Sequence, residues 1–283
     1  MTELAVTSER LAEFASALRA EERLPATVEK YVRDVRRFGD WLGGAPVSRS
    51  SAAEWGEQLA GRRAAATVNA MLAALNKFFA VMGRADCRVK PLRTQRRAFR
   101  SAGRELTRGE YEQLVAAARG MGRERTALVM ETLCATGIRV SELRYITVEA
   151  ARAGRAVVRL KGKTREILIP EKLKLALLRY AKTKKTASGE VFLTRNGCPI
   201  SRKQVWAEMK AVCDRAGVPR SKVFPHNLRH LFARMFYELT LDVAKLADVM
   251  GHSNIETTRI YLISTGEEHM RLLDRLELVL ATE

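Results

Sequence analysis

The amino-acid sequence predicts a mainly α-helical protein of two domains, with one small antiparallel β-sheet in the second domain. Three observations support this fold class. Apolar residues recur at helical spacing through residues 1–89, and a basic stretch without apolar periodicity follows at residues 90–105. An alternating apolar pattern, typical of a β-hairpin, then occurs at residues 156–169. With 283 residues, the chain is long enough for each domain to bury a core of its own.

The first domain, residues 1–89, is predicted to form four helices. We expect Thr27 to cap the second helix, and Ser51 with Glu54 to form a capping box at the start of the third. Basic residues on the opposite faces fit either a solvated surface or a face that follows phosphates. The four apolar stripes are Leu11, Phe14 and Leu18; Tyr31, Val35, Phe38 and Leu42; Trp55 and Leu59; and Val68, Leu72, Leu75, Phe79 and Met82.

Residues 90–105 predict an extended basic linker, which leaves residues 106–283 as the second domain. Five arginines on such a segment are suited to follow a phosphate backbone. We expect the first four of them to contact the backbone of a nucleic acid. The five are Arg93, Arg96, Arg97, Arg100 and Arg104, and the only acidic residue within residues 90–105 is Glu105.

The second domain is predicted to consist of helices around a small sheet. Two of its helices are marked by capping boxes, and a glycine ends its most apolar helix. In order, the elements are a helix opened by Thr107 with Glu110, an apolar helix over 127–135 before Gly137, the hairpin turning at Gly162, a third strand over 191–193, a helix opened by Ser201 with Gln204, and a last amphipathic helix over about 267–280.

The charge of the chain indicates a polyanionic partner. A formal net charge of +18 and a pI near 10.2 favour binding to phosphates, because Lys and Arg that neutralise phosphates release condensed counterions. No apolar run approaches the ~20 residues of a membrane-spanning helix, and the N-terminus does not resemble a secretory signal. The four scattered cysteines predict reduced thiols. A cytoplasmic protein that binds duplex DNA or RNA is therefore expected.

Two motif fragments do not support nucleotide or metal chemistry. Gly162–Thr164 ends like a phosphate-binding loop, but Val157 stands where that loop requires a glycine. His226 and His230 are spaced as in zinc proteases, yet Asn227 replaces the glutamate that those enzymes use. Paired carboxylates suited to Mg²⁺ are also absent near the basic residues. The sequence therefore predicts neither an ATP site nor a metal site.

Six cationic or proton-carrying residues remain as candidates for chemistry. Each of them has a structural explanation when taken singly, as a surface charge, a half-buried imidazole or a core aromatic. Two of them, His226 and Arg229, share one face of a helix that begins after Pro225. They are Arg139, Lys163, His226, Arg229, His252 and Tyr261.

Taken together and in this order, these residues resemble the tyrosine recombinase (phage integrase) family, in its Xer-like two-domain form. The resemblance covers nearly the whole chain. It implies an N-terminal four-helix, SAM-like core-binding domain and a C-terminal catalytic domain. The segments that carry it are TGIRVSEL, GKTREILIP, FLTRNGCPIS, PHNLRHLFA and MGHSNIETTRIYL.

The resemblance implies site-specific recombination, in which DNA strands are cut and rejoined through a 3′-phosphotyrosine at Tyr261. Arg139 and Arg229 would clamp the non-bridging phosphate oxygens, because arginine's planar charged fork suits them. His252 would hydrogen-bond the scissile phosphate. A tyrosine hydroxyl has an ordinary pKa of about 10, so a cationic pocket and a base are needed to activate it. Because the covalent ester stores the bond energy, neither ATP nor a metal cofactor is expected.

The same resemblance assigns the proton carriers. His226 would assist as the base, and Lys163, at the hairpin turn, would protonate the leaving 5′-oxygen. The hairpin is shorter than in many relatives, so Lys161 is a rival to Lys163. Glu142 and His230 are interpreted as structural partners of the site.

The expected assembly is a homotetramer on two recombination sites in duplex DNA, associated with the nucleoid. Accessory DNA-bending or directionality proteins are further candidate partners. The last helix, with Met270, Leu273, Leu276 and Leu280 on one stripe, resembles the tail that such proteins dock into a neighbour, or it packs on its own protomer.

Three alternatives stay open. A DNA-binding protein of this fold that has lost catalysis disagrees with the complete set of matched residues. A topoisomerase IB-like enzyme that relaxes DNA shares the chemistry, and only the docking tail favours assembly. An RNA-binding structural protein is the third, and no RNA-module signature is visible.

Overall fold

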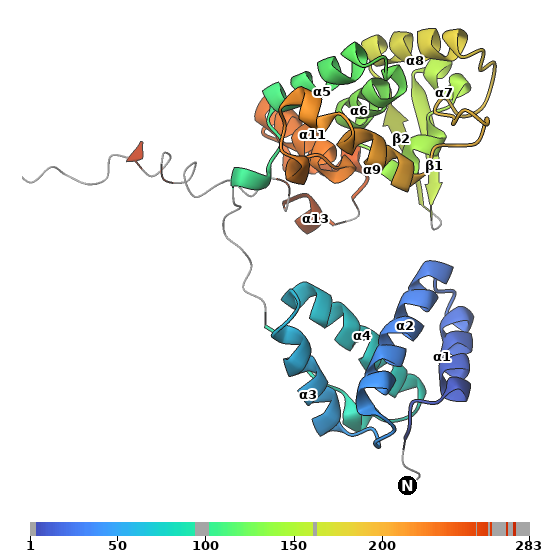
Figure 1. Cartoon of the computed structure of the whole chain (residues 1–283), viewed down its shortest axis with the longest axis vertical. Helices are drawn as coiled ribbons and strands as arrows, with labels where there is room; N and C mark the ends of the chain where they lie inside the picture. Colours follow the sequence, from blue (N-terminus) through green and yellow to red (C-terminus); the bar gives the residue numbers. More distant parts are fainter. Residues whose placement is uncertain are drawn as a thin grey trace, which may run out of the picture. The chain divides into compact units, whose positions relative to one another are not determined.

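The computed structural model describes residues 4–93, 102–160, 163–252, 254–259, 261, 270, 274 and 275. The chain divides into two compact units, residues 1–96 and 97–283, and each is described by itself (Figure 1). The first unit contains α1 (Ser8–Ala20), α2 (Pro25–Leu42), α3 (Arg49–Ala60), α4 (Ala65–Val81) and the short 3-10 helix η1 (Ala85–Cys87).

Aromatic rings fill the core of the first unit. Phe14, Phe38, Phe78 and Phe79 are completely buried. Phe14 meets Phe78 edge to face at 5.4 Å between ring centroids, and Phe38 meets Phe79 in the same way at 6.3 Å. Such pairs contribute about 0.5–1.5 kcal/mol each beyond the burial of their surface. The predicted apolar stripes therefore face one core, and the prediction of four helices is confirmed.

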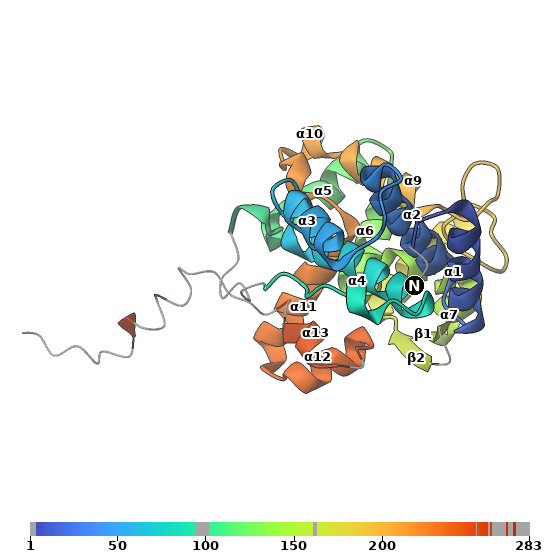
Figure 2. The ribbon, with the colours of Figure 1, turned by 90° about the horizontal axis from the view of Figure 1, so that it is seen from below.

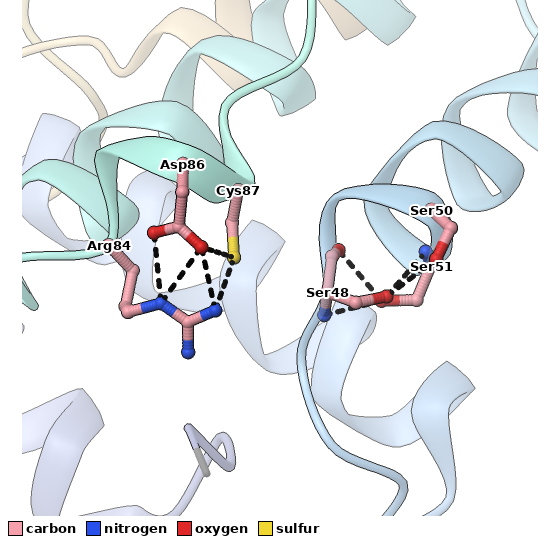
Figure 3. A network of polar contacts seen from close by, with 6 residues as sticks. All are labelled: Ser48, Ser50, Ser51, Arg84, Asp86 and Cys87. Atoms are coloured by element: carbon pink, nitrogen blue, oxygen red, sulfur yellow. Dashed lines mark hydrogen bonds and ion pairs between the residues drawn. The ribbon is translucent and has the colours of Figure 1, made fainter. Parts of the chain in front are cut away.

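Two predicted helix starts in this unit are wrong. Helix α2 begins at Pro25, whose fixed φ and missing N–H suit the first helical position, so Thr27 lies inside the helix and caps nothing. Helix α3 is capped by Ser48 (Figure 3). The Ser51 amide donates to Ser48 Oγ at 3.0 Å, and the Ser48 amide donates back to Ser51 Oγ at 3.0 Å. Ser51 is thus the reciprocal partner of the cap.

Two asparagines of α4 fix the chain that leaves the first unit. Asn76 donates to the carbonyl of Val89 at 2.8 Å and accepts from its amide at 3.0 Å. Asn69 does the same for Leu92, at 3.0 and 2.7 Å. Just before them, Arg84 forms a two-pronged ion pair with Asp86 (Figure 3). The segment after η1 therefore runs along α4 and stays attached to it as far as Leu92.

The second unit is helical apart from one hairpin (Figure 1). Both units together agree with the predicted fold class. Thr107 and Glu110 form the predicted capping box of the first long helix, and Ser201 caps the later one. The elements are η2 (Ala102–Arg104), α5 (Arg108–Gly120), α6 (Glu124–Thr136), η3 (Val140–Tyr145), α7 (Val148–Ala153), β1 (Arg155–Leu160), β2 (Lys163–Leu168), α8 (Glu171–Thr183), α9 (Arg202–Lys210), α10 (Cys213–Ala216), η4 (Arg220–Lys222), α11 (Pro225–Thr240), α12 (Val243–Met250) and α13 (Glu256–Arg259).

The described sheet contains only β1 and β2. They pair antiparallel, with Arg155 opposite Leu168 and Leu160 opposite Lys163, so the predicted hairpin is confirmed. The predicted third strand over residues 191–193 is wrong. Val191 is buried and its amide bonds to the carbonyl of Ile146, but this segment forms only isolated bridges. Its apolar run reflects burial of a loop in the core, which periodicity alone does not distinguish from a strand.

Helix α6 lies at the centre of the second unit and packs against α5 and α11. It ends at Gly137, whose φ is +61°. A Cβ atom at this position would lie 2.2 Å from Cδ1 of Phe232 on α11. A glycine is therefore required both by the left-handed backbone and by the close approach of α11. Helix α12 packs against α11, and α13 packs against α12, so the three helices lie side by side (Figure 2).

Several sequence predictions lie outside the described residues. They concern Arg96, Arg97 and Arg100 of the linker, Lys161 of the hairpin, and the last helix with Leu273, Leu276 and Leu280. Within the described part of the chain, no helix combines the length and apolar character needed to cross a membrane.

The close approach at Gly137 generates a stability prediction. Replacing Gly137 with Ala should lower the free energy of unfolding by roughly 2–4 kcal/mol, from left-handed backbone strain of about 1–2 kcal/mol plus overpacking against Phe232. Gly154→Ala is the matched control, because its φ is +70° and its Cβ would meet no atom within 4 Å. Urea unfolding of both variants measures the difference. Equal losses would show that the approach of α11 does not constrain this position.

Candidate active site

Arg229 forms the centre of the candidate site. It lies on α11, in the turn after Pro225, and only 1% of the residue is exposed. Its Nη1 donates to the carbonyl of Gly137 at the end of α6, and its Nη2 donates to the carbonyl of Met250 at 3.0 Å. These bonds orient a permanently charged guanidinium between the ends of two helices. The pKa of Arg229 is lowered from its usual value, chiefly by burial.

His252 is held against Arg229 in its neutral form. Arg229 Nη2 lies 2.8 Å from His252 Nε2, and Thr258 Oγ1 lies 2.8 Å from Nδ1. Because a guanidinium only donates, Nε2 accepts, and the ring proton resides on Nδ1, facing Thr258. Burial and the neighbouring charge of Arg229 lower the pKa of His252 to about 4. His252 therefore orients Arg229.

Tyr261 packs among these groups. It follows α13, with its amide bonded to the carbonyl of Thr258, and it is 9% exposed. Its ring centroid lies 4.3 Å from that of His230, 5.6 Å from that of His226 and 5.7 Å from that of His252. The central carbon of the Arg229 guanidinium lies 6.0 Å from the same ring. The tyrosine thus lies beside a fixed cation and three imidazoles.

Arg139 is anchored through a buried carboxylate. It precedes η3, and its amide donates to Glu142 Oε2 at 2.7 Å, while its Nη1 lies 3.3 Å from Glu142 Oε1. The Glu142 side chain is 1% exposed, whereas that of Arg139 is 45% exposed. Glu142 therefore orients the guanidinium of Arg139, which remains accessible to solvent. The interpretation of Glu142 as a structural partner agrees with these contacts.

A third arginine, Arg165, joins the site although sequence reasoning did not select it. It lies on β2, and its Nη2 donates to Glu142 Oε2 at 2.5 Å. Its Nη1 donates to the carbonyl of Val249 near the end of α12 at 3.3 Å. A Cβ atom at Gly251 would lie 2.3 Å from Arg165 Cδ, so this glycine leaves room for the arginine. Only the three-dimensional contacts identify it, because no local spacing links it to its partners.

The site carries an excess of positive charge. The guanidinium groups of Arg139 and Arg165 both contact the carboxylate of Glu142, and their charges both contribute to the lowered pKa of Arg229. Such an arrangement suits an anion that gains negative charge during reaction. Among the residues that the structure describes, no three His, Cys, Asp or Glu side chains gather as a metal site requires.

The structure brings most of the predicted residues together. Arg229, His252, His226 and Tyr261 are linked by the contacts above, and Arg139 is linked electrostatically to Arg229. Lys163 is the first residue of β2, beside the hairpin turn, and its side chain lies outside the described part. Of the predicted linker contacts, only Arg93 is described, and it is exposed.

The linker also ends beside this site. Asn227, on α11 between His226 and Arg229, donates to the carbonyl of Arg104 at 2.8 Å. Arg234, further along α11, forms an ion pair of 2.8 Å with Glu105. The second unit thus fixes the last linker residues on the same helix that carries Arg229.

The state of His252 generates a prediction. NMR titration of the DNA-free protein with labelled histidine should give His252 a pKa near 4, against about 6.5 in the unfolded chain. Between these values the unfolded chain binds the extra proton, so stability falls as the pH drops from about 6.5 to 4. The His252→Gln variant should not show this part of the loss of stability at acidic pH. A pKa at or above 6.5 would contradict the contact with Arg229.

Comparisons with known proteins agree with this geometry. The model of the phage integrase family matches residues 104–268, and that of the phage integrase N-terminal SAM-like domain matches residues 11–85. A tyrosine recombinase XerA of Thermococcus kodakarensis is 28% identical, with 96% of each chain covered.

Two solved structures share the fold. The Tn1549 transposon integrase in complex with transposon right end DNA has a TM-score of 0.71 at 20% identity, covering 95% of this chain and 99% of that one. A lambda integrase tetramer bound to a Holliday junction has a TM-score of 0.73 at 18% identity, covering 91% and 77%. Since the family model spans more than half of the chain, from η2 to beyond Tyr261, this protein belongs to the phage integrase family of tyrosine recombinases.

Proposed function

We propose that this chain is a metal- and ATP-independent, site-specific DNA recombinase that cuts and rejoins duplex DNA through a 3′-phosphotyrosine at Tyr261. One observation carries the proposal: a tyrosine lies beside the buried guanidinium of Arg229 and three imidazoles. A nucleophile next to a cation that cannot lose its charge is what attack on a negative phosphodiester requires.

The cleavage step follows from the charges of the site. The Tyr261 oxygen attacks the scissile phosphorus, the bond between phosphorus and the 5′-oxygen breaks, and the 3′-phosphate remains on the tyrosine. Negative charge grows on the non-bridging oxygens, and the guanidinium groups of Arg139 and Arg229 stabilise it. Religation reverses these bond changes, with a 5′-hydroxyl as the nucleophile. No external energy source enters this sequence of steps.

Two protons move during cleavage. We assign His226 as the group that assists removal of the proton from Tyr261, since it is exposed and lies near the phenol ring. His230, whose ring is closer still, orients that ring from the next turn of α11. Lys163 is the proposed acid for the 5′-oxygen. For His252 to donate a hydrogen bond to the phosphate, its ring must exchange its present contacts with Arg229 and Thr258.

The proposed DNA complex uses both units. The basic linker, including Arg93, Arg96, Arg97 and Arg100, follows the phosphate backbone, and four protomers assemble on two recombination sites. The structural likeness to the lambda integrase, which forms a tetramer bound to a Holliday junction, supports this assembly. We further propose that the final helix docks on a neighbouring protomer and that the protein acts on nucleoid DNA in the cytoplasm, with accessory DNA-bending or directionality proteins as partners.

The nucleophile is tested with Tyr261→Phe. A nicked duplex, derived from sequences selected for binding from a random pool, should trap the wild-type protein as a covalent adduct visible on a denaturing gel. Tyr261→Phe should form no adduct, while its DNA dissociation constant stays within a few-fold, because only the nucleophilic oxygen is lost.

Tyr237→Phe is the control for this test, because Tyr237 packs in the same apolar cluster. It should form the adduct at the wild-type rate. An adduct with Tyr261→Phe would refute the nucleophile. A wild-type protein that binds the DNA but never forms an adduct would be a silent DNA-binding protein, and adduct formation with relaxation but no strand exchange would indicate a topoisomerase.

The acid is tested by changing the leaving group. Lys163→Ala should slow cleavage of ordinary DNA by roughly 10²–10⁴-fold, the range of general acid catalysis. With sulfur in place of the bridging 5′-oxygen, the thiolate leaves without a proton, so Lys163→Ala should cleave at nearly the wild-type rate. Lys161→Ala is the comparison. If that variant alone is slow on ordinary DNA and rescued by sulfur, the acid is Lys161.

A further inference from the structure

Arg165 connects three chain segments of the second unit. Its backbone belongs to β2, the strand that begins with Lys163. Its guanidinium bonds to Glu142, the anchor of Arg139, and to the carbonyl of Val249. The partners are 23 and 84 residues away in the sequence. One side chain thus links the hairpin, the segment of Arg139 and the end of α12 that leads into His252.

The contact with Glu142 determines how Arg139 is held. The Glu142 carboxylate is almost completely buried and has two arginine partners, Arg139 and Arg165. Without Arg165, the buried carboxylate would keep the Arg139 amide and the longer, partly exposed contact to the Arg139 guanidinium. A buried carboxylate that loses its charged partner is left uncompensated and reorients toward its remaining donors. This reorientation moves the Arg139 guanidinium, because Glu142 is its only hydrogen-bond partner in the described part of the chain.

The contact with Val249 fixes the end of α12. The last carbonyls of a helix lack partners within the helix and carry the negative end of its dipole, so a guanidinium there is favourable. The stem of Arg165 crosses Gly251, where a side chain would collide with it. Gly251 immediately precedes His252, which in turn orients Arg229. Arg165 therefore contacts Glu142, which supports Arg139, and also Val249 and Gly251, the neighbours in sequence of Met250 and His252, which support Arg229.

Arg165 is more enclosed than Arg139, the other arginine that Glu142 anchors. The Arg165 side chain is 16% exposed, and its Nε is buried with no hydrogen-bond partner in the described residues. Both Nη groups already have acceptors within the protein. By contrast, the Arg139 side chain is 45% exposed. Of the two arginines that Glu142 anchors, Arg139 is thus the one that an incoming anion reaches more readily.

We propose that Arg165 is a positioning residue for the cleavage reaction. It fixes Arg139 through Glu142, and it fixes the chain before His252 through its contact with the end of α12. This role rests on the proposed recombinase function, because it acts through the residues that bind the phosphate. The fork of a guanidinium is needed, since two acceptors on different segments must be reached at once.

The test compares Arg165→Met and Arg165→Lys with Arg155→Met. Arg155 lies on the neighbouring strand of the same hairpin, and its ion pair with Glu166 is at the surface. Covalent adduct formation is measured on the nicked duplex under single-turnover conditions, together with the DNA dissociation constant and the melting temperature. Arg165→Met should reduce the adduct rate by about 10- to 100-fold, the scale of a small misplacement of catalytic groups. Its DNA affinity should change less than about threefold.

The conservative variant and the control discriminate the role further. Arg165→Lys reaches one acceptor and should recover part of the rate, whereas Arg155→Met should retain the wild-type rate. Glu142→Gln combined with Arg165→Met should be little slower than the slower single variant, because both act through one pathway. If the reduction in adduct rate of the double variant equals the product of the two single reductions, Arg165 does not act through Glu142.

Three results would separate failure of this inference from failure of the proposed function. A normal adduct rate in Arg165→Met, with a lowered melting temperature, would make Arg165 purely structural. An equal loss in Arg165→Lys and Arg165→Met, with weakened DNA binding, would make it a direct DNA contact. If the wild-type protein itself forms no adduct, the recombinase function fails first.

Discussion

A guanidinium cannot lose its charge, and the second unit buries one almost completely in Arg229. Such a charge is tolerated only where acceptors surround it. The acceptors are the Gly137 carbonyl at the end of α6, the Met250 carbonyl at the end of α12, and the imidazole of His252. The helix ends are drawn together by this requirement. The neutral state of His252 follows from this arrangement, and Tyr261 lies beside the same guanidinium.

A second constraint is that Glu142 pairs with two arginines at once. One buried carboxylate organises two arginines, of which one is accessible and one is enclosed. The accessible arginine has less internal support than Arg229, which is held by three acceptors. The two proposed clamps thus differ in rigidity: Arg229 is preorganised by backbone carbonyls, whereas Arg139 depends on a chain of side chains. Preorganised donors are most effective where charge develops in a transition state.

The sequence predicted the parts of this fold that depend on local patterns. The apolar stripe through Leu72 and Phe79 identifies α4, and Thr107 with Glu110 marks the start of α5, because both partners of each signal are near in sequence. The start of α3 was misplaced because Ser48 and Ser51 both fit a cap. The resemblance selected Arg139, Arg229 and Tyr261 from their motifs. Arg165 was missed, since its partners are defined only by folding, at 23 and 84 residues' separation.

The asparagine contacts at the two ends of the linker set the length of chain that can extend between the units. Asn69 holds Leu92 on the first unit, and Asn227 holds Arg104 on the second. At about 3.3–3.6 Å per residue, the chain between these points spans at most roughly 40 Å. When one unit binds DNA, this length limits how far the other unit can be from the same duplex. The effective concentration of the second unit there rises to the order of millimolar. Two weak contacts with DNA can then act as one strong contact.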